Sequence, residues 1–111
     1  VRLSELGDEN EPRVSVLDQP GSILIVPQAT LGGRMKGKAI QYHKNVDRDK
    51  GRELYDLFIE LCKKYANENA KWHENDCRVE SGTYGIRQVY STETNGPYLH
   101  LMIFRFRFFY L

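Results

Sequence analysis

The strongest periodic pattern in the chain lies between residues 50 and 67. Five apolar side chains recur there at i, i+3, i+4, i+7 and i+11: Leu54, Leu57, Phe58, Leu61 and Tyr65. Because an α-helix turns once every 3.6 residues, this spacing places the five on one face and leaves the acids and lysines on the other. The pattern predicts an amphipathic helix over 50–67, with Asp47 or Asp49 as its N-terminal cap.

Before the helix, the pattern changes to the period of two that is typical of strands. Val14 and Val16 alternate with polar residues, and residues 23–26 form a short apolar run. Between them, residues 19–22 (QPGS) have a proline that presets φ at the second turn position and a glycine that allows a positive φ at the third. We therefore predict a β-hairpin closed by a type II turn.

Three further strands are predicted after the helix. Residues 77–81 (CRVES) alternate, residues 86–93 (IRQVYSTE) are rich in β-forming side chains, and residues 98–104 (YLHLMIF) follow a turn at 94–97. The predicted order is β-β-α-β-β-β, with a hairpin at each end. It indicates an α+β fold with one long amphipathic helix and a mixed, mainly antiparallel sheet.

The end of the chain extends the last predicted strand. In residues 104–111 (FRFRFFYL) phenylalanines and arginines alternate, and such a segment promotes aggregation when it is left unpaired. A chain of 111 residues is most simply one domain. We expect that domain to span residues 1–104, and residues 105–111 to be an additional apolar and basic tail.

The composition is that of an ordinary soluble domain, with 41% hydrophobic and 28% charged residues. No apolar run approaches the roughly 18 residues that a membrane helix needs, and no basic-then-apolar leader follows Val1. Cys62 and Cys77 are too few and too far apart for a disulfide framework. We expect reduced thiols in a cytoplasmic protein, with Cys62 packed on the apolar side of the helix.

The net charge is only +1, but the charges are distributed unevenly. Residues 1–18 carry five acids against two bases, whereas residues 34–52 carry seven bases against two acids. A local excess of positive charge beside a glycine-rich loop fits a polyanionic partner, and it equally fits a solvated surface. Charge alone leaves both interpretations open.

The glycine-rich loop has the spacing of a phosphate-binding P-loop in Gly32-x-x-x-x-Gly37-Lys38. Ala39 stands where that motif needs a serine or threonine hydroxyl for magnesium, and no strong helical pattern begins at Lys38. The three histidines are scattered, and no G-x-S-x-G elbow marks a nucleophile. The sequence predicts neither a metal site nor a cofactor.

Two polar loops that contain glycine remain as candidates for chemistry: residues 27–33 (PQATLGG) and residues 94–97 (TNGP). Such loops offer backbone N–H groups and small polar side chains, which are the components of an oxyanion hole. They are also typical of ordinary turns. The residues alone do not choose between these interpretations.

Both loops resemble those of a known family. Residues 27–43 (PQATLGGRMKGKAIQYH) and 82–104 (GTYGIRQVYSTETNGPYLHLMIF) are similar to segments of the D-aminoacyl-tRNA deacylases, above all to the animal branch with a Gly-transPro motif. The resemblance implies a small α/β or α+β domain that forms a homodimer, with the active sites at the interface. It also implies an activity, the hydrolysis of the ester that links a wrong amino acid to tRNA.

The resemblance further implies roles for individual residues. Gln28, Ala29 and Thr30 would be catalytic: Gln28 orients the adenosine or the ester, while the Ala29–Thr30 backbone and the Thr30 hydroxyl polarise the carbonyl. No side-chain nucleophile is needed, because the 2′-hydroxyl of the RNA assists. The residues implied to bind the substrate, the Gly-Pro pair by screening its α-carbon, are Pro27, Leu31, Gly32, Asn95, Gly96 and Pro97. Those implied to meet tRNA phosphates are Arg34, Lys36 and Lys38.

The function expected from the resemblance is proofreading in translation, by hydrolysis of D-aminoacyl-tRNA and of L-alanyl-tRNA(Thr). The sequence departs from the family in two ways: Leu99 stands where a threonine is usual, and family chains begin further upstream. We expect a domain that is incomplete at its N-terminus and weakly active. The alternatives are a non-catalytic RNA-binding module and an inactive fragment.

Overall fold

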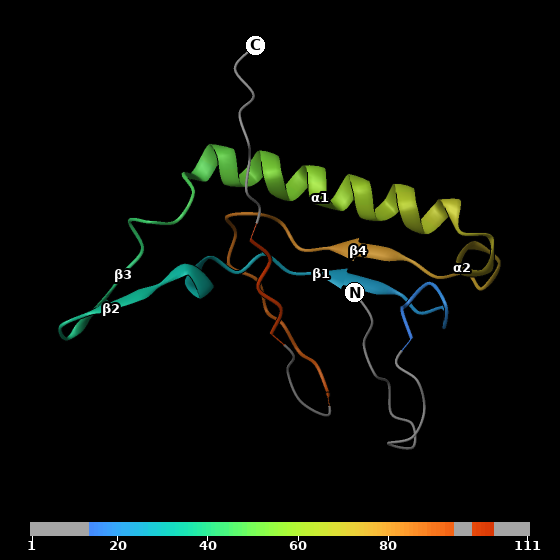
Figure 1. The fold of residues 1–111 in the computed structure, drawn as a ribbon, viewed down its shortest axis with the longest axis horizontal. Helices are drawn as coiled ribbons and strands as arrows, with labels where there is room; N and C mark the ends of the chain where they lie inside the picture. The colour runs from blue at the N-terminus through green and yellow to red at the C-terminus, as the bar shows by residue number, and fades with distance from the viewer. Residues whose placement is uncertain (1–13, 95–98, 104–111) are drawn as a thin grey trace, which may run out of the picture.

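The computed structural model describes residues 14–94 and 99–103, and Figure 1 shows how their elements are arranged. In chain order these are β1 (Ile23–Ile25), the 3-10 turn η1 (Ala29–Gly32), β2 (Arg34–Lys36), β3 (Ala39–Gln41), α1 (Arg48–Glu68), α2 (Ala70–Glu74) and β4 (Val79–Ser81). β1 and β4 form a parallel pair, and β2 and β3 form an antiparallel ribbon. Helix α1 lies along the parallel pair and contacts β4, so that β1, α1 and β4 make a β-α-β unit.

Helix α1 confirms the predicted helix, with a start two residues earlier and an end one residue later. The Asp47 carboxylate accepts hydrogen bonds from the backbone N–H groups of Asp49 and Lys50, at 3.1 and 3.0 Å. This cap satisfies two of the first amides of the helix, which have no partner inside it. At the other end Asn69 takes an extended backbone, and its side chain accepts from the Trp72 N–H to begin α2.

The side of α1 that packs on the parallel pair is not the predicted apolar face. Its least exposed positions follow a second line along the helix: Gly51, Tyr55, Ile59, Cys62 and Ala66. The five apolar side chains of the predicted face remain between 37% and 58% exposed. This line begins with Gly51 and ends with Ala66, and such small residues let the helix approach the strands closely. Cys62 lies on the same line, which fits the packing role expected for it.

The predicted hairpin over residues 14–26 is wrong. Val14 makes one isolated bridge, and the chain then turns back on itself, with the backbone N–H groups of Asp18 and Gln19 donating to the Ser15 carbonyl. A type II turn needs a positive φ at Gly21. Among the described glycines only Gly37 and Gly85 have a positive φ, so Gly21 does not form this turn. The second strand of the expected hairpin corresponds to β1. It pairs with β4, which lies more than fifty residues further along the chain.

The strand predictions after the helix have mixed outcomes. β4 confirms the strand expected within 77–81, but residues 86–93 and 99–103 form no strand. The described sheets are one parallel and one antiparallel pair, so a mainly antiparallel sheet is not confirmed, whereas a fold of mixed helix and small sheets is compatible with the α+β class. β-forming side chains require a neighbouring strand, and in the described residues these segments pair with none. The tail at 105–111 and most of the turn at 94–97 lie outside the described residues.

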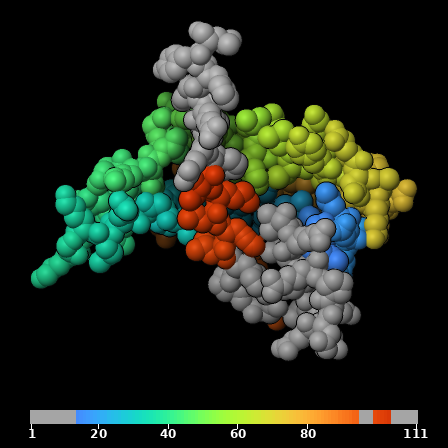
Figure 2. Space-filling model, viewed as in Figure 1, coloured from blue at the N-terminus to red at the C-terminus, as the bar shows by residue number. Residues whose placement is uncertain are grey.

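The fully buried apolar side chains of the described part are few and lie at one end of α1. Ala66 and Trp72 are each 2% exposed. The Trp72 indole N–H donates to the Gly21 carbonyl at 2.9 Å, which fastens α2 to the segment before β1. At the opposite end, the ribbon of β2 and β3 projects from the body of the molecule (Figure 2). None of the helices in the described residues is long and apolar enough to cross a membrane.

Candidate functional site

The candidate site lies where the two parallel strands end. Because β1 and β4 run in the same direction, the loops that follow them meet at one edge of the pair. The first of these loops is the predicted segment 27–33, and the second is residues 82–86, which belong to the other segment of the resemblance. The fold therefore joins a predicted loop to a segment that carried no predicted role.

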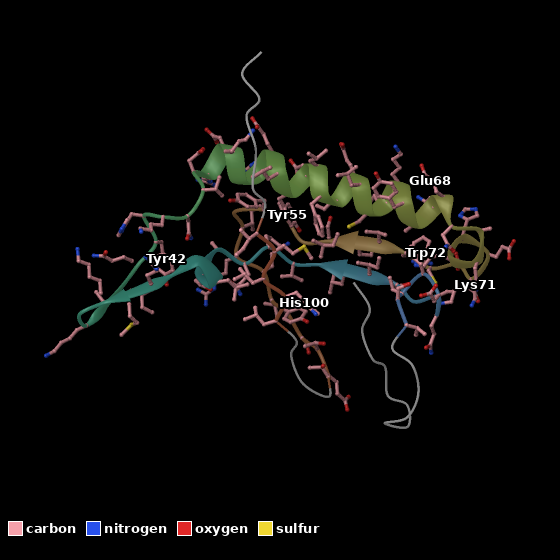
Figure 3. The ribbon with its side chains drawn as sticks, in the orientation of Figure 1. Tyr42, Tyr55, Glu68, Lys71, Trp72 and His100 are labelled. Carbon is pink, nitrogen blue, oxygen red and sulfur yellow. The ribbon has the colours of Figure 1, made fainter. Side chains whose placement is uncertain are left out.

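Tyr55 of α1 ties the two strand ends together. Its hydroxyl lies 3.0 Å from the Ile25 carbonyl oxygen and 2.7 Å from the Gly82 carbonyl oxygen. The Gly82 N–H also donates to the Ile25 carbonyl, at 2.8 Å. Figure 3 shows Tyr55 between the helix and the strands. Its hydroxyl proton is shared between the carbonyls at the two strand ends, so this side chain and the Gly82–Ile25 backbone bond together hold the ends in place.

The protonation state of Tyr55 suits this role. Burial raises the pKa of its hydroxyl above the ordinary 10.0, and the charge of the neighbouring Asp56 raises it further. The group therefore stays a donor throughout the neutral range. Its ring also approaches that of Tyr84, with the centroids 5.7 Å apart and a tilt of 42°.

Above this support the loops enclose a hollow of about 370 Å³. It is lined by Pro27, Gln28, Ala29, Gly32, Asn45, Val46, Tyr55 and Tyr84. A hollow of about 460 Å³ adjoins it, because the two share five of their lining residues. The second hollow adds Arg48, Gly85 and Ile86. We call the two together the loop pocket.

Hydrogen bonds fix the polar groups of the first loop. The Thr30 hydroxyl donates to the Gln28 side-chain oxygen at 2.8 Å, and the Gln28 side chain does not cap η1. With its oxygen engaged, Gln28 keeps its amide N–H₂ group as a donor. The first backbone amides of a 3-10 turn, here those of Ala29 and Thr30, have no acceptor inside the turn. The loop thus holds neutral donors next to the loop pocket, which Gln28 and Ala29 line.

A second contact holds η1 in place from the segment before α1. The Asn45 side-chain N–H₂ donates to the Ala29 carbonyl at 2.9 Å. Gly32 lies directly against the Asn45 amide, which occupies the space where a Cβ on residue 32 would stand. Glycine at position 32 is therefore needed for this approach, and its role is not that of a P-loop glycine.

The structure brings some of the predicted site residues together and separates others. Pro27, Gln28, Ala29 and Gly32 line the loop pocket, and Thr30 acts on it through Gln28. Leu31 is 76% exposed and does not line it. The predicted residues Asn95, Gly96 and Pro97 lie outside the described residues.

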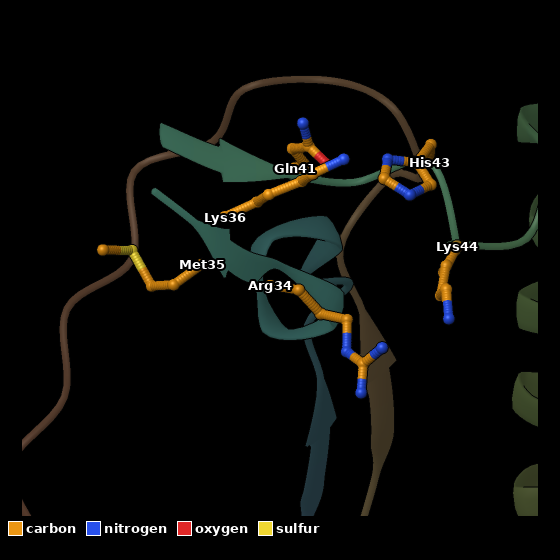
Figure 4. A pocket seen from close by; sticks show the side chains of 6 residues that line it. All are labelled: Arg34, Met35, Lys36, Gln41, His43 and Lys44. Atoms are coloured by element: carbon orange, nitrogen blue, oxygen red, sulfur yellow. The ribbon is translucent and has the colours of Figure 1, made fainter. Parts of the chain in front are cut away.

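The three predicted phosphate-binding residues belong to the ribbon. In its register Arg34 stands opposite Gln41, and Lys36 stands opposite Ala39, so both cations lie on one face. A hollow of about 470 Å³ on this face is lined by Arg34, Met35, Lys36, Gln41, His43 and Lys44 (Figure 4). Three cations and no acid line it. Lys38 follows Gly37 in the turn at the tip and is absent from this lining.

Sequence reasoning missed Asn45, Arg48, Tyr55 and Tyr84. Tyr55 lies one position beside the apolar stripe of the helix, and Tyr84 lies within the GTYG motif without a role of its own. Asn45 and Arg48 flank the helix cap, where polar residues are expected for local reasons. Of these four residues, only Tyr84 lies in a motif that the sequence singled out. In the described part of the chain, histidine, cysteine and acidic side chains form no group of three or more that could hold a metal ion.

Comparisons with known proteins show the family to which this chain belongs. The sequence model of the D-Tyr-tRNA(Tyr) deacylase family matches residues 1–103, and the chain belongs to that family. The chain is 55% identical over 104 residues to D-aminoacyl-tRNA deacylase 2 of Gallus gallus and 54% identical over 104 residues to that of Homo sapiens, in each case over 94% of this chain and 61% of the relative. It is 32% identical over 99 residues to a D-aminoacyl-tRNA deacylase of Thermosipho africanus, covering 87% of this chain and 60% of the relative. The chain thus spans about three fifths of the length of these curated relatives.

Proposed function

We propose that this chain carries the adenosine and ester site of an aminoacyl-tRNA deacylase, which hydrolyses the bond between an amino acid and the terminal ribose of tRNA. Membership of the family supports the reaction class. The observation that carries the proposal is the meeting of the Gln28–Ala29 loop with Tyr84 around one hollow at the end of the parallel pair. Neutral donors and an aromatic ring are suited to an uncharged, already activated ester on a nucleoside.

In this mechanism the protein positions the ester and polarises its carbonyl, and a water molecule cleaves the ester bond. Water adds to the ester carbonyl carbon, the bond to the ribose oxygen breaks, and the proton from water leaves on that oxygen with help from the adjacent 2′-hydroxyl. Negative charge develops on the carbonyl oxygen, where the Gln28 amide and the backbone N–H groups of Ala29 and Thr30 donate. The geometry favours Gln28 over the Thr30 hydroxyl as the side-chain donor, because Thr30 donates to Gln28.

The finer features are part of the same proposal. The substrates are D-aminoacyl-tRNA and L-alanyl-tRNA(Thr), Leu31 and Asn95 contact them, and the Gly96–Pro97 pair screens the α-carbon. The chain acts in the cytoplasm as part of a homodimer, without a cofactor. The cationic face of the ribbon, with Arg34 and Lys36, supports contact with tRNA phosphates. Lys38 at the tip makes a more distant contact.

The test is release of the amino acid from tRNA charged with a D-amino acid, by this chain and by a variant with Gln28→Ala and Thr30→Ala. We expect the variant to lose about 100- to 1,000-fold in turnover, the usual effect of removing an oxyanion donor. Its affinity for uncharged tRNA should remain unchanged. Equal release by the variant and the natural chain would contradict the mechanism.

The cationic ribbon also favours a second candidate function, a non-catalytic RNA-binding module. The same assay separates the two. A module of that kind binds tRNA with salt-dependent affinity and releases no amino acid above the spontaneous rate. Such a result would leave the ribbon as the functional region and remove the loop pocket from consideration.

A further inference from the structure

Arg48 differs from every other residue that lines the loop pocket. The remaining lining residues are apolar, aromatic, amide-bearing or glycine, and Arg48 alone carries a charge. It is the first residue of α1, and it shares its hollow with Gln28, Ala29 and Tyr84. A permanent positive charge therefore faces the space in which an acylated nucleoside would lie.

The guanidinium lies beside the second loop. Gly85 has a φ of +79°, a conformation that side chains other than glycine rarely adopt. A Cβ at Gly85 would stand 3.3 Å from the nearer terminal nitrogen of Arg48. The bare backbone of this glycine thus lets the loop run close beside the guanidinium, at the rim of the pocket.

The guanidinium is not neutralised inside the described part of the chain. The one ion pair there joins Lys50 to Glu53 at 2.9 Å, on the exposed surface of α1. Two acids, Asp47 and Asp49, flank Arg48 in the sequence, and in the described residues neither forms an ion pair with it. The Asp47 carboxylate instead caps the backbone amides of Asp49 and Lys50. Arg48 thus keeps its forked set of N–H donors, which matches a phosphate in geometry as well as in charge.

One short segment connects this cation to the ribbon. His43 and Lys44 line the cationic hollow of the ribbon, Asn45 and Val46 line the loop pocket, and Arg48 stands at the pocket rim. Residues 43–48 therefore border both hollows. A polyanion that leaves the pocket beside Arg48 would follow this segment to the cationic face of the ribbon.

We propose that Arg48 binds the phosphodiester that joins the terminal adenosine to the preceding nucleotide, and that it directs the RNA strand toward the ribbon. This inference rests on the proposed function, because it assumes an aminoacylated RNA end in the loop pocket. The ester itself has no negative charge in the ground state, and its amino group is a cation that Arg48 repels. The nearest anionic group of such a substrate is this phosphodiester, so Arg48 makes the site select a polynucleotide over an acylated nucleoside.

The experiment compares two substrates that differ in the phosphodiester: a D-aminoacyl-tRNA, and the same amino acid esterified to adenosine. Arg48→Gln removes the positive charge and the forked N–H donors of the guanidinium. Lys50→Gln is the matched control, because it removes one positive charge two residues away on the same helix. We expect Arg48→Gln to lower kcat/KM for the tRNA by about 10- to 100-fold, the range for a lost hydrogen bond to a charged group, mostly through KM. For the adenosine ester, the same substitution should change kcat/KM less than twofold.

Two further measurements sharpen the result. Arg48→Lys keeps the charge without the fork, and it should recover part of the loss. In salt titrations, the slope of log affinity against log salt should decrease by about 0.7 for Arg48→Gln, the value for one phosphate contact on single-stranded RNA. A thermal melt of each variant confirms that it is folded.

The inference is overturned if Arg48→Gln slows both substrates equally, or slows the tRNA no more than Lys50→Gln does, while the natural chain hydrolyses both. If the natural chain hydrolyses neither ester, the proposed function fails, and binding decides the inference. The ligands are then the trinucleotide CCA and adenosine. Loss of CCA binding by Arg48→Gln with unchanged adenosine binding supports the phosphodiester contact, and equal binding overturns it.

Discussion

The loop pocket and the ribbon use two different means of recognition within one short chain. Apart from Arg48, the loop pocket is lined by neutral groups, whose positions depend on hydrogen bonds between distant residues, such as those of Tyr55 to Ile25 and Gly82. The ribbon is a local hairpin whose cations Arg34 and Lys36 stand at alternate positions of β2. The first needs accurate placement and the second needs only charge.

This difference indicates how each region should respond to mutation. A neutral donor acts over one hydrogen-bond length, so that a displacement of about 1 Å in its loop is costly. A cation near a phosphate tolerates displacement, but salt screens it over a Debye length of roughly 10 Å. Mutations of the neutral groups of the pocket should therefore change turnover, whereas mutations of Arg48 or of the ribbon should change affinity and its dependence on salt.

Among the variants that test this comparison through the supporting contacts, the largest effect is expected from removing the Tyr55 hydroxyl, which bonds to both strand ends. Tyr55→Phe keeps the ring and its packing against Tyr84 but leaves two carbonyls without this donor. We expect the free energy of unfolding to fall by about 1–2 kcal/mol, and turnover to fall about tenfold because the loops lose one of the contacts that position them. Chemical denaturation and the deacylation assay measure the two. Unchanged turnover in the stably folded variant would show that the hydroxyl does not position the site.

A smaller effect is expected at the contact between η1 and the segment before the helix. Gly32→Ala should displace the Asn45 amide from the Ala29 carbonyl, and Asn45→Ala should remove the same bond. Each should cost about 1 kcal/mol. Because both act on one contact, the double variant should cost far less than the sum of the two. Additive losses in a double-mutant cycle would contradict this shared contact.

The ribbon provides the contrasting case. Arg34→Gln combined with Lys36→Gln should weaken tRNA binding about fivefold near 0.1 M salt and reduce the salt slope by about 1.4, or 0.7 for each lost phosphate contact. Turnover at saturating substrate should not change. Lys38→Gln is the matched control, since Lys38 lies at the tip outside the hollow, and its effect should stay within twofold. A fall in saturated turnover would remove the distinction between the two regions.

The smallest effect concerns pH. The folded pKa of Tyr55 lies above the unfolded value near 10.0. Its contribution to stability is therefore complete below about pH 10 and is lost as pH rises through the folded pKa. The natural chain should lose stability more steeply than Tyr55→Phe above about pH 10. Tyr65→Phe, at an exposed position of the same helix, should follow the natural chain.

The fold was predictable where its cause is local. The period of the apolar residues and the cap at Asp47 placed α1 to within two residues, and alternation placed β4. The predicted hairpin failed because turn-forming residues at 19–22 do not select a partner strand. The strand predicted at 86–93 from its β-forming side chains failed for the same reason, since such residues indicate a suitable surface but not the presence of a neighbouring strand.

The candidate site was predictable only through its motif. The resemblance of residues 27–43 singled out Gln28 and Ala29, which line the loop pocket. It did not separate Arg34 and Lys36 from Lys38, because spacing alone does not show which cation stands at the tip of a turn. Arg48 was counted in the basic stretch without a role.

The sequence by itself determined the elements whose interactions lie within a few residues: the long helix, its cap and the composition of the first loop. Only the tertiary structure decided that β1 pairs in parallel with β4, which side of α1 packs on them, and that Tyr55 meets both strand ends. The physical reason is separation along the chain. The two hydrogen bonds of the Tyr55 hydroxyl span 30 and 27 residues, and contacts over such distances leave no periodic or capping pattern in the sequence.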